Sequence, residues 1–185
     1  MTSTERLFVA IPIPGEVRHA VDDWRAGLDL PGRLVPAENF HITLRFIGDA
    51  DQVGKERVMA ALSEAELGDA FNIHVGGFGA FPKLSKATVG WASLEDSQGE
   101  LVELADAIDE AVAEAGFGYE DRPFHPHLSV VRIRPQRDLR TVDTARRVGA
   151  KIQVREIVLY RSRFAGRGVS YDPLEKWELY PVSIG

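Results

Sequence analysis

The sequence of 185 residues contains no cysteine. A disulfide-stabilised scaffold is therefore excluded, and so is a zinc or iron–sulfur site that depends on cysteine thiolates. Long apolar runs are also missing, because the apolar stretch RLFVAIPI near the N-terminus is short and ends at Pro14 and Gly15. It has neither the basic start of a signal peptide nor the length of a membrane span. We therefore expect a cytoplasmic protein that does not interact with membranes.

Positive charge is the minority charge, since 22 Lys and Arg residues face 28 Asp and Glu residues and the net charge is −6. Tight, nonspecific binding of long nucleic acids needs many phosphate contacts from basic side chains. The composition argues against such a function, although a few local cations suffice for a site that binds the end of a nucleic acid. With 44% hydrophobic residues, we expect one domain over 1–185 with a sizeable core, and a monomer by default.

Apolar spacing predicts a succession of strands and helices. Strands are expected at 6–13, 39–48, 71–81, 87–94, 125–133, 151–164 and 170–180. Helices are expected after the first, second and fourth of these strands, where apolar residues recur at helical spacing, and a polar linker is expected over 134–149. The order does not follow the strict strand–helix alternation of a parallel sheet. It indicates an α+β fold with two similar halves, each of which has one histidine-bearing strand.

These two strands carry related motifs, NFHITLRFIGD from residue 39 and PFHPHLSVVR from residue 123. Side chains alternate between the faces of a strand. His41 and Thr43 should therefore share one face, and so should His127 and Ser129, while the intervening aliphatic residues point into the core. If the halves pack about a pseudo-twofold axis, the two His–hydroxyl pairs face each other across a cleft.

Such a pair of half-sites suits general acid–base catalysis at phosphorus. One imidazole can accept a proton from water while the other donates a proton to a leaving oxygen, because the unperturbed pKa is near ~6.5. The hydroxyls can donate hydrogen bonds to phosphoryl oxygens, and no metal is required. A single histidine in a strand is more often a packing residue, so the hypothesis depends on the motif occurring twice.

The motifs HITL and HLSV resemble the two signatures of the 2H phosphoesterase superfamily. Together with RLFVAIPIP near the start and YRSRFAGRGVSYDPLEKWEL near the end, they make nearly the whole chain similar to the RNA 2′,3′-cyclic phosphodiesterases, also called LigT-like proteins or 2′-5′ RNA ligases. The resemblance implies two similar α+β lobes with antiparallel sheets around a central groove. It also implies hydrolysis of a 2′,3′-cyclic phosphate on RNA or a nucleotide to a 2′-phosphomonoester, reversible 2′-5′ ligation, and no cofactor.

The resemblance further implies residue roles. His41 and His127 would be the acid–base pair, and Thr43 and Ser129 would bind phosphate. Ser129 stands where the family often has threonine, which keeps the hydroxyl donor but constrains its rotamer less. Because a 2′-phosphate forms when the bond from phosphorus to O3′ breaks, we expect His41 to protonate O3′ and His127 to activate water.

Three further residues are candidates for contacting the substrate. The family often has an arginine at the position of Arg132, but strand alternation places it opposite His127, where a structural ion pair is the alternative. Arg45 follows the alternation of His41 and could reach the site, or it could be a solvated strand residue. His125 could orient the site or line its mouth, and we do not expect it to ligate a metal.

The arginines at 161, 163 and 167 surround two glycines near the C-terminus. They could guide an RNA end toward the cleft, or they could belong to a solvated hairpin turn. Two other functions remain open for the whole chain. One keeps the site but changes the substrate to 2′-5′ oligonucleotides or small cyclic phosphates. The other is a non-catalytic module that binds nucleotides or RNA ends, for which a matched acid and base would not be needed.

Overall fold

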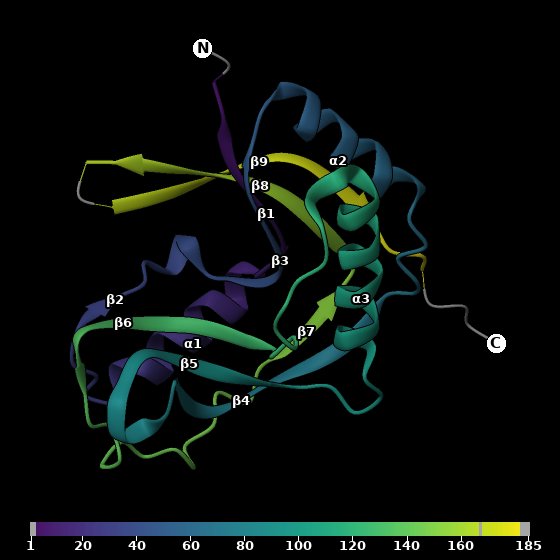
Figure 1. Cartoon of the computed structure of the whole chain (residues 1–185). Coiled ribbons are helices and arrows are strands. Elements are labelled where there is room, and N and C mark those ends of the chain that lie inside the picture. Colours follow the sequence, from purple (N-terminus) through teal and green to yellow (C-terminus); the bar gives the residue numbers. More distant parts are fainter. Residues whose placement is uncertain (1–2, 167, 182–185) are drawn as a thin grey trace.

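The computed structural model describes residues 3–166 and 168–181 and contains two antiparallel sheets (Figure 1). The four-stranded sheet has the order β3 (His41–Ala50), β1 (Glu5–Pro12), β8 (Glu156–Ala165) and β9 (Gly168–Glu178). The five-stranded sheet has the order β2 (Arg33–Leu34), β6 (His127–Arg137), β5 (Ala87–Glu95), β4 (Phe71–Phe81) and β7 (Lys151–Val154). The predicted α+β class is confirmed, and each sheet contains one of the two histidine motifs.

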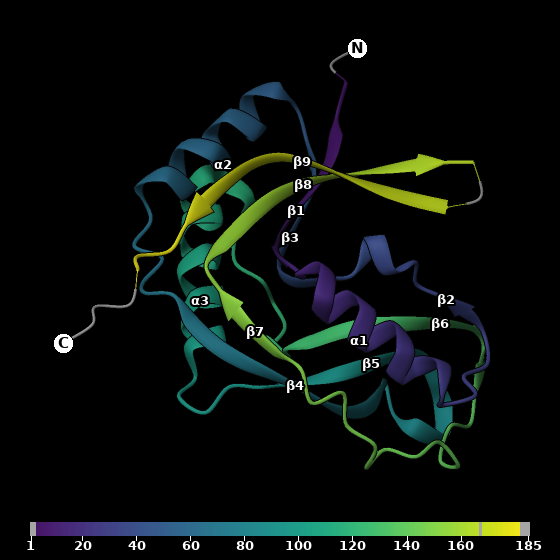
Figure 2. The same ribbon diagram turned by 180° about the vertical axis from the view of Figure 1, so that it is seen from behind.

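The helices cover one face of each sheet (Figure 2). Helix α1 (Gly15–Ala26) packs on the five-stranded sheet, where the Trp24 ring lies 6.3 Å from that of Phe78. Helices α2 (Gln52–Glu64) and α3 (Glu100–Val112) cover the four-stranded sheet, and the Asp51 side chain caps α2 by accepting a hydrogen bond of 2.8 Å from the Gly54 N–H. The short helical turns are η1 (Ala37–Asn39), η2 (Leu84–Lys86) and η3 (Ala113–Phe117). The uncovered faces of the sheets are left for the site.

The predicted strand over 151–164 is two strands in different sheets. β7 pairs with β4, whereas β8 begins after Arg155 and pairs with β1. The apolar pattern continues through this crossing, so the sequence gives no sign of it. The predicted linker over 134–149 is also partly wrong, because β6 continues to Arg137. The strand β2 is too short for a pattern to reveal.

Each histidine strand has a β-bulge at the same distance from its histidine. In β3, Thr43 pairs with Ala10 and Arg45 with Val9, so Leu44 is the extra residue. In β6, Ser129 pairs with Trp91 and Val131 with Gly90, so Val130 is the extra residue. A bulge inserts one residue and thereby reverses the alternation of faces beyond it. Side chains after the bulges therefore point to the face opposite to the one that simple alternation predicts.

A single cluster of buried apolar side chains draws on both sheets and all three helices. It includes Ile42 and Leu44 from β3 and Leu128 and Val130 from β6, which confirms that the aliphatic residues of both motifs point into the core. None of the helices in the described ranges is long and apolar enough to cross a membrane.

Candidate active site

The two histidines are held in the same way by the chain that precedes them. His41 Nδ1 lies 2.7 Å from the carbonyl oxygen of Asn39, and His127 Nδ1 lies 2.8 Å from that of His125. A carbonyl oxygen can only accept, so Nδ1 must carry the hydrogen in both rings. In the neutral form of each ring the lone pair is then on Nε2, which is the atom that can accept or deliver a proton.

The structure brings the two motifs together, as the sequence predicted. Strands β3 and β6 contact each other although they belong to different sheets. The charge of His127 lowers the pKa of His41, and the charge of Arg132 lowers the pKa of both histidines. Such effects require groups that lie close together with little water between them. His41, His127 and Arg132 therefore belong to one site.

Burial is the largest cause of the lowered pKa of both imidazoles. It lowers the pKa of His41 from 6.5 to about 4, although the hydrogen bond to Asn39 opposes the shift. Burial also lowers the pKa of His127, again against the hydrogen bond to His125. Desolvation disfavours the charged form of a histidine. His41 is thus neutral at neutral pH in the free protein, and His127 is the ring that takes up a proton more readily.

The two hydroxyls lie on the histidine faces of their strands, before the bulges. Thr43 and Ser129 are both half-buried. In the part of the chain that the structure describes, no hydrogen bond is formed by either side chain, whereas both backbones are fixed in the sheets. Each hydroxyl is therefore free to donate to a bound anion.

Arg132 lies on the same face as His127, and the prediction of the opposite face was wrong. The bulge at Val130 reverses the alternation, so Val131 is buried and Arg132 is exposed on the face that carries His127 and Ser129. Its charge acts on both imidazoles. The arginine therefore lies close to both histidines.

The bulge at Leu44 in β3 likewise turns Arg45 away from the site. The prediction that Arg45 lies on the face of His41 was therefore also wrong. The side chain is buried, its Nε forms an ion pair with Asp109 of α3, and its Nη2 donates to the Gly118 carbonyl oxygen over 2.6 Å. Arg45 therefore ties β3 to α3. Phe46, the next residue, takes the position on the histidine face and is 58% exposed.

His125 contributes to the site through its backbone. Its carbonyl oxygen fixes the His127 ring, while its side chain is exposed and lies 5.1 Å from the Phe81 ring and 5.4 Å from the Trp91 ring. This arrangement orients His127 without requiring a particular side chain at position 125.

Each histidine is flanked by aromatic rings. His41 lies 5.0 Å from Phe8 and 5.0 Å from Tyr171, and His127 lies 4.9 Å from Phe81 and 6.3 Å from Trp91. Tyr171 and Phe81 were not predicted from the sequence to be site residues. Their alternation within β9 and β4 is visible in the sequence, yet only the pairing of the strands shows which face meets the histidines.

Gly79 makes room for one of these rings. A Cβ atom on Gly79 would lie 2.2 Å from the Trp91 ring, well inside van der Waals contact. The six-membered ring of the Trp91 indole therefore packs against the backbone of β4 at Gly79, and this position depends on glycine. The ring in turn forms part of the apolar surround that desolvates His127.

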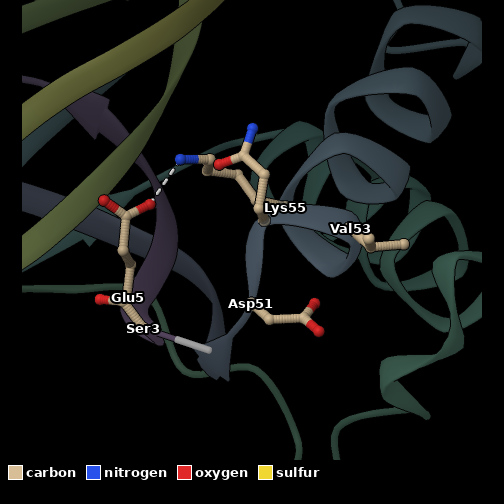
Figure 3. Close-up of a pocket in the computed structure, with 6 residues that line it drawn as sticks. Ser3, Glu5, Asp51, Val53 and Lys55 are labelled. Atoms are coloured by element: carbon tan, nitrogen blue, oxygen red, sulfur yellow. Dashed lines mark hydrogen bonds and ion pairs between the residues drawn. The ribbon is translucent and has the colours of Figure 1, made fainter. Parts of the chain in front are cut away.

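Two surface pockets of the described residues are lined by neither His41 nor His127. One of about 300 Å³ is lined by residues of β1 and α2, including Glu5 and Lys55, whose ion pair of 2.6 Å is drawn in Figure 3. Another is lined by the first turns of α1, with His19, and by η1. Within the described ranges, no group of three or more His, Asp or Glu side chains is arranged to hold a metal ion.

The geometry can be compared with known proteins. The family model described as LigT like Phosphoesterase matches residues 11–91 and 93–171, so each matched stretch contains one histidine motif. The chain is 31% identical to the RNA 2′,3′-cyclic phosphodiesterase of Escherichia coli (strain K12), over 97% of this chain and 99% of the relative. It is 32% identical to the protein of the same name from Aeropyrum pernix, over 84% of this chain and 90% of the relative.

Solved structures agree with these sequence matches. The crystal structure of E. coli LigT in apo form superposes with a TM-score of 0.81 at 29% identity, over 97% of this chain and 99% of that one. The crystal structure of E. coli LigT complexed with 3′-AMP gives a TM-score of 0.83 at 28% identity, over 96% of this chain and 99% of that one. The chain belongs to the LigT-like family of 2H phosphoesterases.

Proposed function

We propose that this protein is a phosphodiesterase that hydrolyses a 2′,3′-cyclic phosphate at an RNA 3′ end, or on a nucleotide, to a 2′-phosphomonoester. The observation that carries the proposal is the pair of imidazoles, each with Nδ1–H bound to a carbonyl oxygen and Nε2 available. A relative named RNA 2′,3′-cyclic phosphodiesterase matches over nearly the whole chain, and E. coli LigT has been crystallised with 3′-AMP.

The reaction is an in-line displacement at phosphorus. A water molecule attacks the phosphorus atom, the bond to O3′ breaks, and the 2′-phosphomonoester remains. One imidazole Nε2 takes a proton from the attacking water, and the other gives a proton to the departing O3′. The hydroxyls of Thr43 and Ser129 and the guanidinium of Arg132 hold the two non-bridging oxygens, where they offset charge that builds up in the transition state.

The order of the two histidines follows from their burial. A base must be neutral before the reaction, and burial holds the pKa of His41 at about 4. The pKa of His127 is lowered less strongly, so His127 is the ring that carries a proton more readily. The proposal thus assigns the base to His41 and the acid to His127, which reverses the order expected from the sequence.

The first experiment measures hydrolysis of a short oligoribonucleotide ending in 2′,3′-cyclic phosphate, with a chelator present. We expect turnover to the 2′-phosphate in the wild type and loss of turnover in His41→Gln and in His127→Gln. A histidine outside the site, the exposed His74 on β4, provides the control substitution His74→Gln. Tight binding without turnover in the wild type would instead identify a binding module, and turnover lost with the chelator would identify a metal-dependent enzyme.

A second experiment decides the order of the histidines. When the leaving group of a phosphodiester is an aryloxide, it departs without protonation. Hydrolysis of such a substrate therefore does not need the general acid. His127→Gln should therefore recover much of its activity on the aryl ester, whereas His41→Gln should not. The opposite pattern would show that His41 is the general acid, as expected from the sequence.

Four further expectations remain predictions. Reversible 2′-5′ ligation is tested by incubating the 2′-phosphate-forming enzyme with a cyclic-phosphate end and a free 5′-hydroxyl end. The monomeric state is tested by light scattering, and location in the cytoplasm by fractionation of cells. Independence of any cofactor is tested by the chelator experiment with extensively dialysed protein.

A further inference from the structure

A row of arginines continues from the site along the five-stranded sheet. Arg132 and Arg134 flank the buried Ile133 on β6, so they share the face that carries His127 and Ser129. Arg33 of β2 pairs directly with Arg132, and directly paired residues of antiparallel strands place their side chains on the same face. We call Arg33, Arg132 and Arg134 the β2–β6 arginine strip.

The charge of this strip is not compensated. All three side chains are exposed, and no ion pair to any of them is present within the described ranges. The chain as a whole carries a net charge of −6, so acidic side chains are plentiful but are placed elsewhere. Like charges directly opposite each other in a sheet are destabilising, and an anionic ligand between Arg33 and Arg132 would relieve that cost.

The β8–β9 hairpin, which the sequence singled out, does not offer free charge of this kind. Arg161 forms ion pairs with Glu5 and with Asp172, and Arg163 forms one with Asp172. Arg167 lies outside the described residues. The two described arginines of the hairpin are thus used to hold it to β1 and β9, and free positive charge near the site lies on β2 and β6 instead.

A glycine allows β2 to reach this place. Gly32 has a φ of +105°, and a Cβ atom there would lie 2.5 Å from the Arg132 carbonyl oxygen. Only glycine accepts both the backbone angle and the close approach. Arg33 is therefore brought beside Arg132 by a specific local feature of the chain rather than by a long strand.

The direction of the strip matches the polarity of the substrate. A 2′,3′-cyclic phosphate is the last phosphate of an RNA, so every other phosphate lies on its 5′ side. The strip begins beside Ser129 and runs along β6 away from His127, with Arg132 and Arg134 about 7 Å apart. We propose that Arg33 and Arg134, the two members of the strip that do not hold the cyclic phosphate, bind one or two internucleotide phosphates on its 5′ side, which makes oligoribonucleotides better substrates than cyclic mononucleotides. This inference rests on the proposed function.

The test compares cytidine 2′,3′-cyclic phosphate with a tetraribonucleotide that ends in the same group. We expect kcat/KM to be higher for the tetraribonucleotide, and the difference to fall with salt with a log–log slope of about −1.4 for two phosphates. Arg33→Gln and Arg134→Gln should each lower kcat/KM on the tetraribonucleotide by about three- to tenfold and reduce the slope by about 0.7, with little effect on the mononucleotide.

Arg155→Gln is the matched control. It removes the same charge from an exposed side chain at the other end of β8 from the hairpin tip, and Arg155 also has no acidic partner within the described ranges. Equal kcat/KM for the two substrates, or equal losses in Arg134→Gln and Arg155→Gln, would overturn the inference while leaving the proposed function intact. Failure of the wild type to hydrolyse either substrate would overturn the proposed function itself.

Discussion

The half-sites on β3 and β6 share one backbone design. Each presents a histidine whose Nδ1–H binds the carbonyl oxygen two residues earlier, then a hydroxyl on the same face, then a bulge after the hydroxyl. Because the bulge lies at the same offset in both strands, the similarity of the halves extends beyond the letters of the motifs. The duplicated unit is a strand with a defined irregularity, which sets where the following side chains point.

The halves differ in the two side chains that follow the bulge, one of which points to the core and the other to the histidine face. On the core side, β3 has Arg45, which binds Asp109, whereas β6 has the apolar Val131. On the histidine side, β3 has the exposed Phe46, whereas β6 has Arg132. One half-site is therefore flanked by an aromatic ring and the other by a guanidinium, although their backbones follow the same course.

Their imidazoles also differ in how strongly burial disfavours the charged form. Burial lowers the pKa of His41 to about 4 and lowers that of His127 less strongly. The proposed hydrolysis uses one proton acceptor and one proton donor, and unequal burial favours one assignment of these roles over the other. The two half-sites thus share one backbone geometry and differ in the burial of their imidazoles and in the arginine that only β6 presents on the histidine face.

The largest expected effect comes from removing either imidazole. His41→Gln and His127→Gln should each lower kcat on the cyclic-phosphate end by about 10²–10⁴-fold. The double variant should be little worse than the poorer single variant, because the two groups act as a unit. His125→Gln should retain activity within about threefold, since only its carbonyl oxygen orients His127. Single-turnover rates test this, and additive losses in the double variant would contradict a coupled pair.

The hydroxyls should give the next largest effect. Removing one donor to a transition-state oxyanion typically costs about 10²–10³-fold in kcat, so Thr43→Ala and Ser129→Ala should each fall near the lower end of that range. The exchanges Thr43→Ser and Ser129→Thr keep the donor and should change kcat by less than about threefold. If the exchanges were as damaging as the alanine variants, packing of the methyl group rather than hydrogen bonding would explain the requirement.

Much of this arrangement could be predicted from the sequence. Apolar periodicity located the strands and helices, because burial on one face leaves a regular pattern. Alternation placed His41 with Thr43 and His127 with Ser129, since both pairs precede the bulges. The resemblance of the two motifs to each other indicated the duplication, and the family match to two consecutive stretches supports it.

The errors have one physical cause. Arg45 and Arg132 were assigned to the wrong faces because a bulge is fixed by pairing with a neighbouring strand, and that partner is distant in sequence. The crossing at Arg155 was missed for the same reason, as each sheet determines where its own edge strand ends. Local patterns predict which residues are buried, whereas the register of paired strands decides which exposed residues meet.

Arg132 and Phe46 occupy equivalent places, so substituting each tests the asymmetry directly. Charge-assisted hydrogen bonds contribute about 1.5–3 kcal/mol, so Arg132→Ala should lower kcat/KM by about 10–100-fold. It should also move both limbs of the pH–rate profile upward, because the arginine charge lowers the pKa of His41 and of His127. Phe46→Ala should change kcat/KM by less than about threefold and leave the limbs in place.

Arg45→Met provides the control for that experiment. The arginine is buried against Asp109, so its loss should lower the free energy of unfolding by about 3 kcal/mol and leave the pH–rate profile unchanged. A shift of the limbs in Arg45→Met would mean that any nearby positive charge acts on the imidazoles, and that the placement of Arg132 on the histidine face has no special role.

The smallest expected effect concerns stability, and it distinguishes the two histidines without any substrate. The pKa of His41 is 6.5 as an ordinary value and about 4 in the folded protein. As the pH falls from 6.5 to 4, the unfolded chain therefore binds a proton at this position that the folded chain does not bind, and the free energy of unfolding decreases. His41→Gln removes this contribution, so denaturant unfolding at a series of pH values should show a flatter profile in that window, by about 3 kcal/mol at its acid end. His127→Gln should flatten the profile less, because the pKa of His127 is lowered less strongly. Equal flattening in both variants would show that the two half-sites are equally desolvated, and the assignment of the base to His41 would then lose its physical ground.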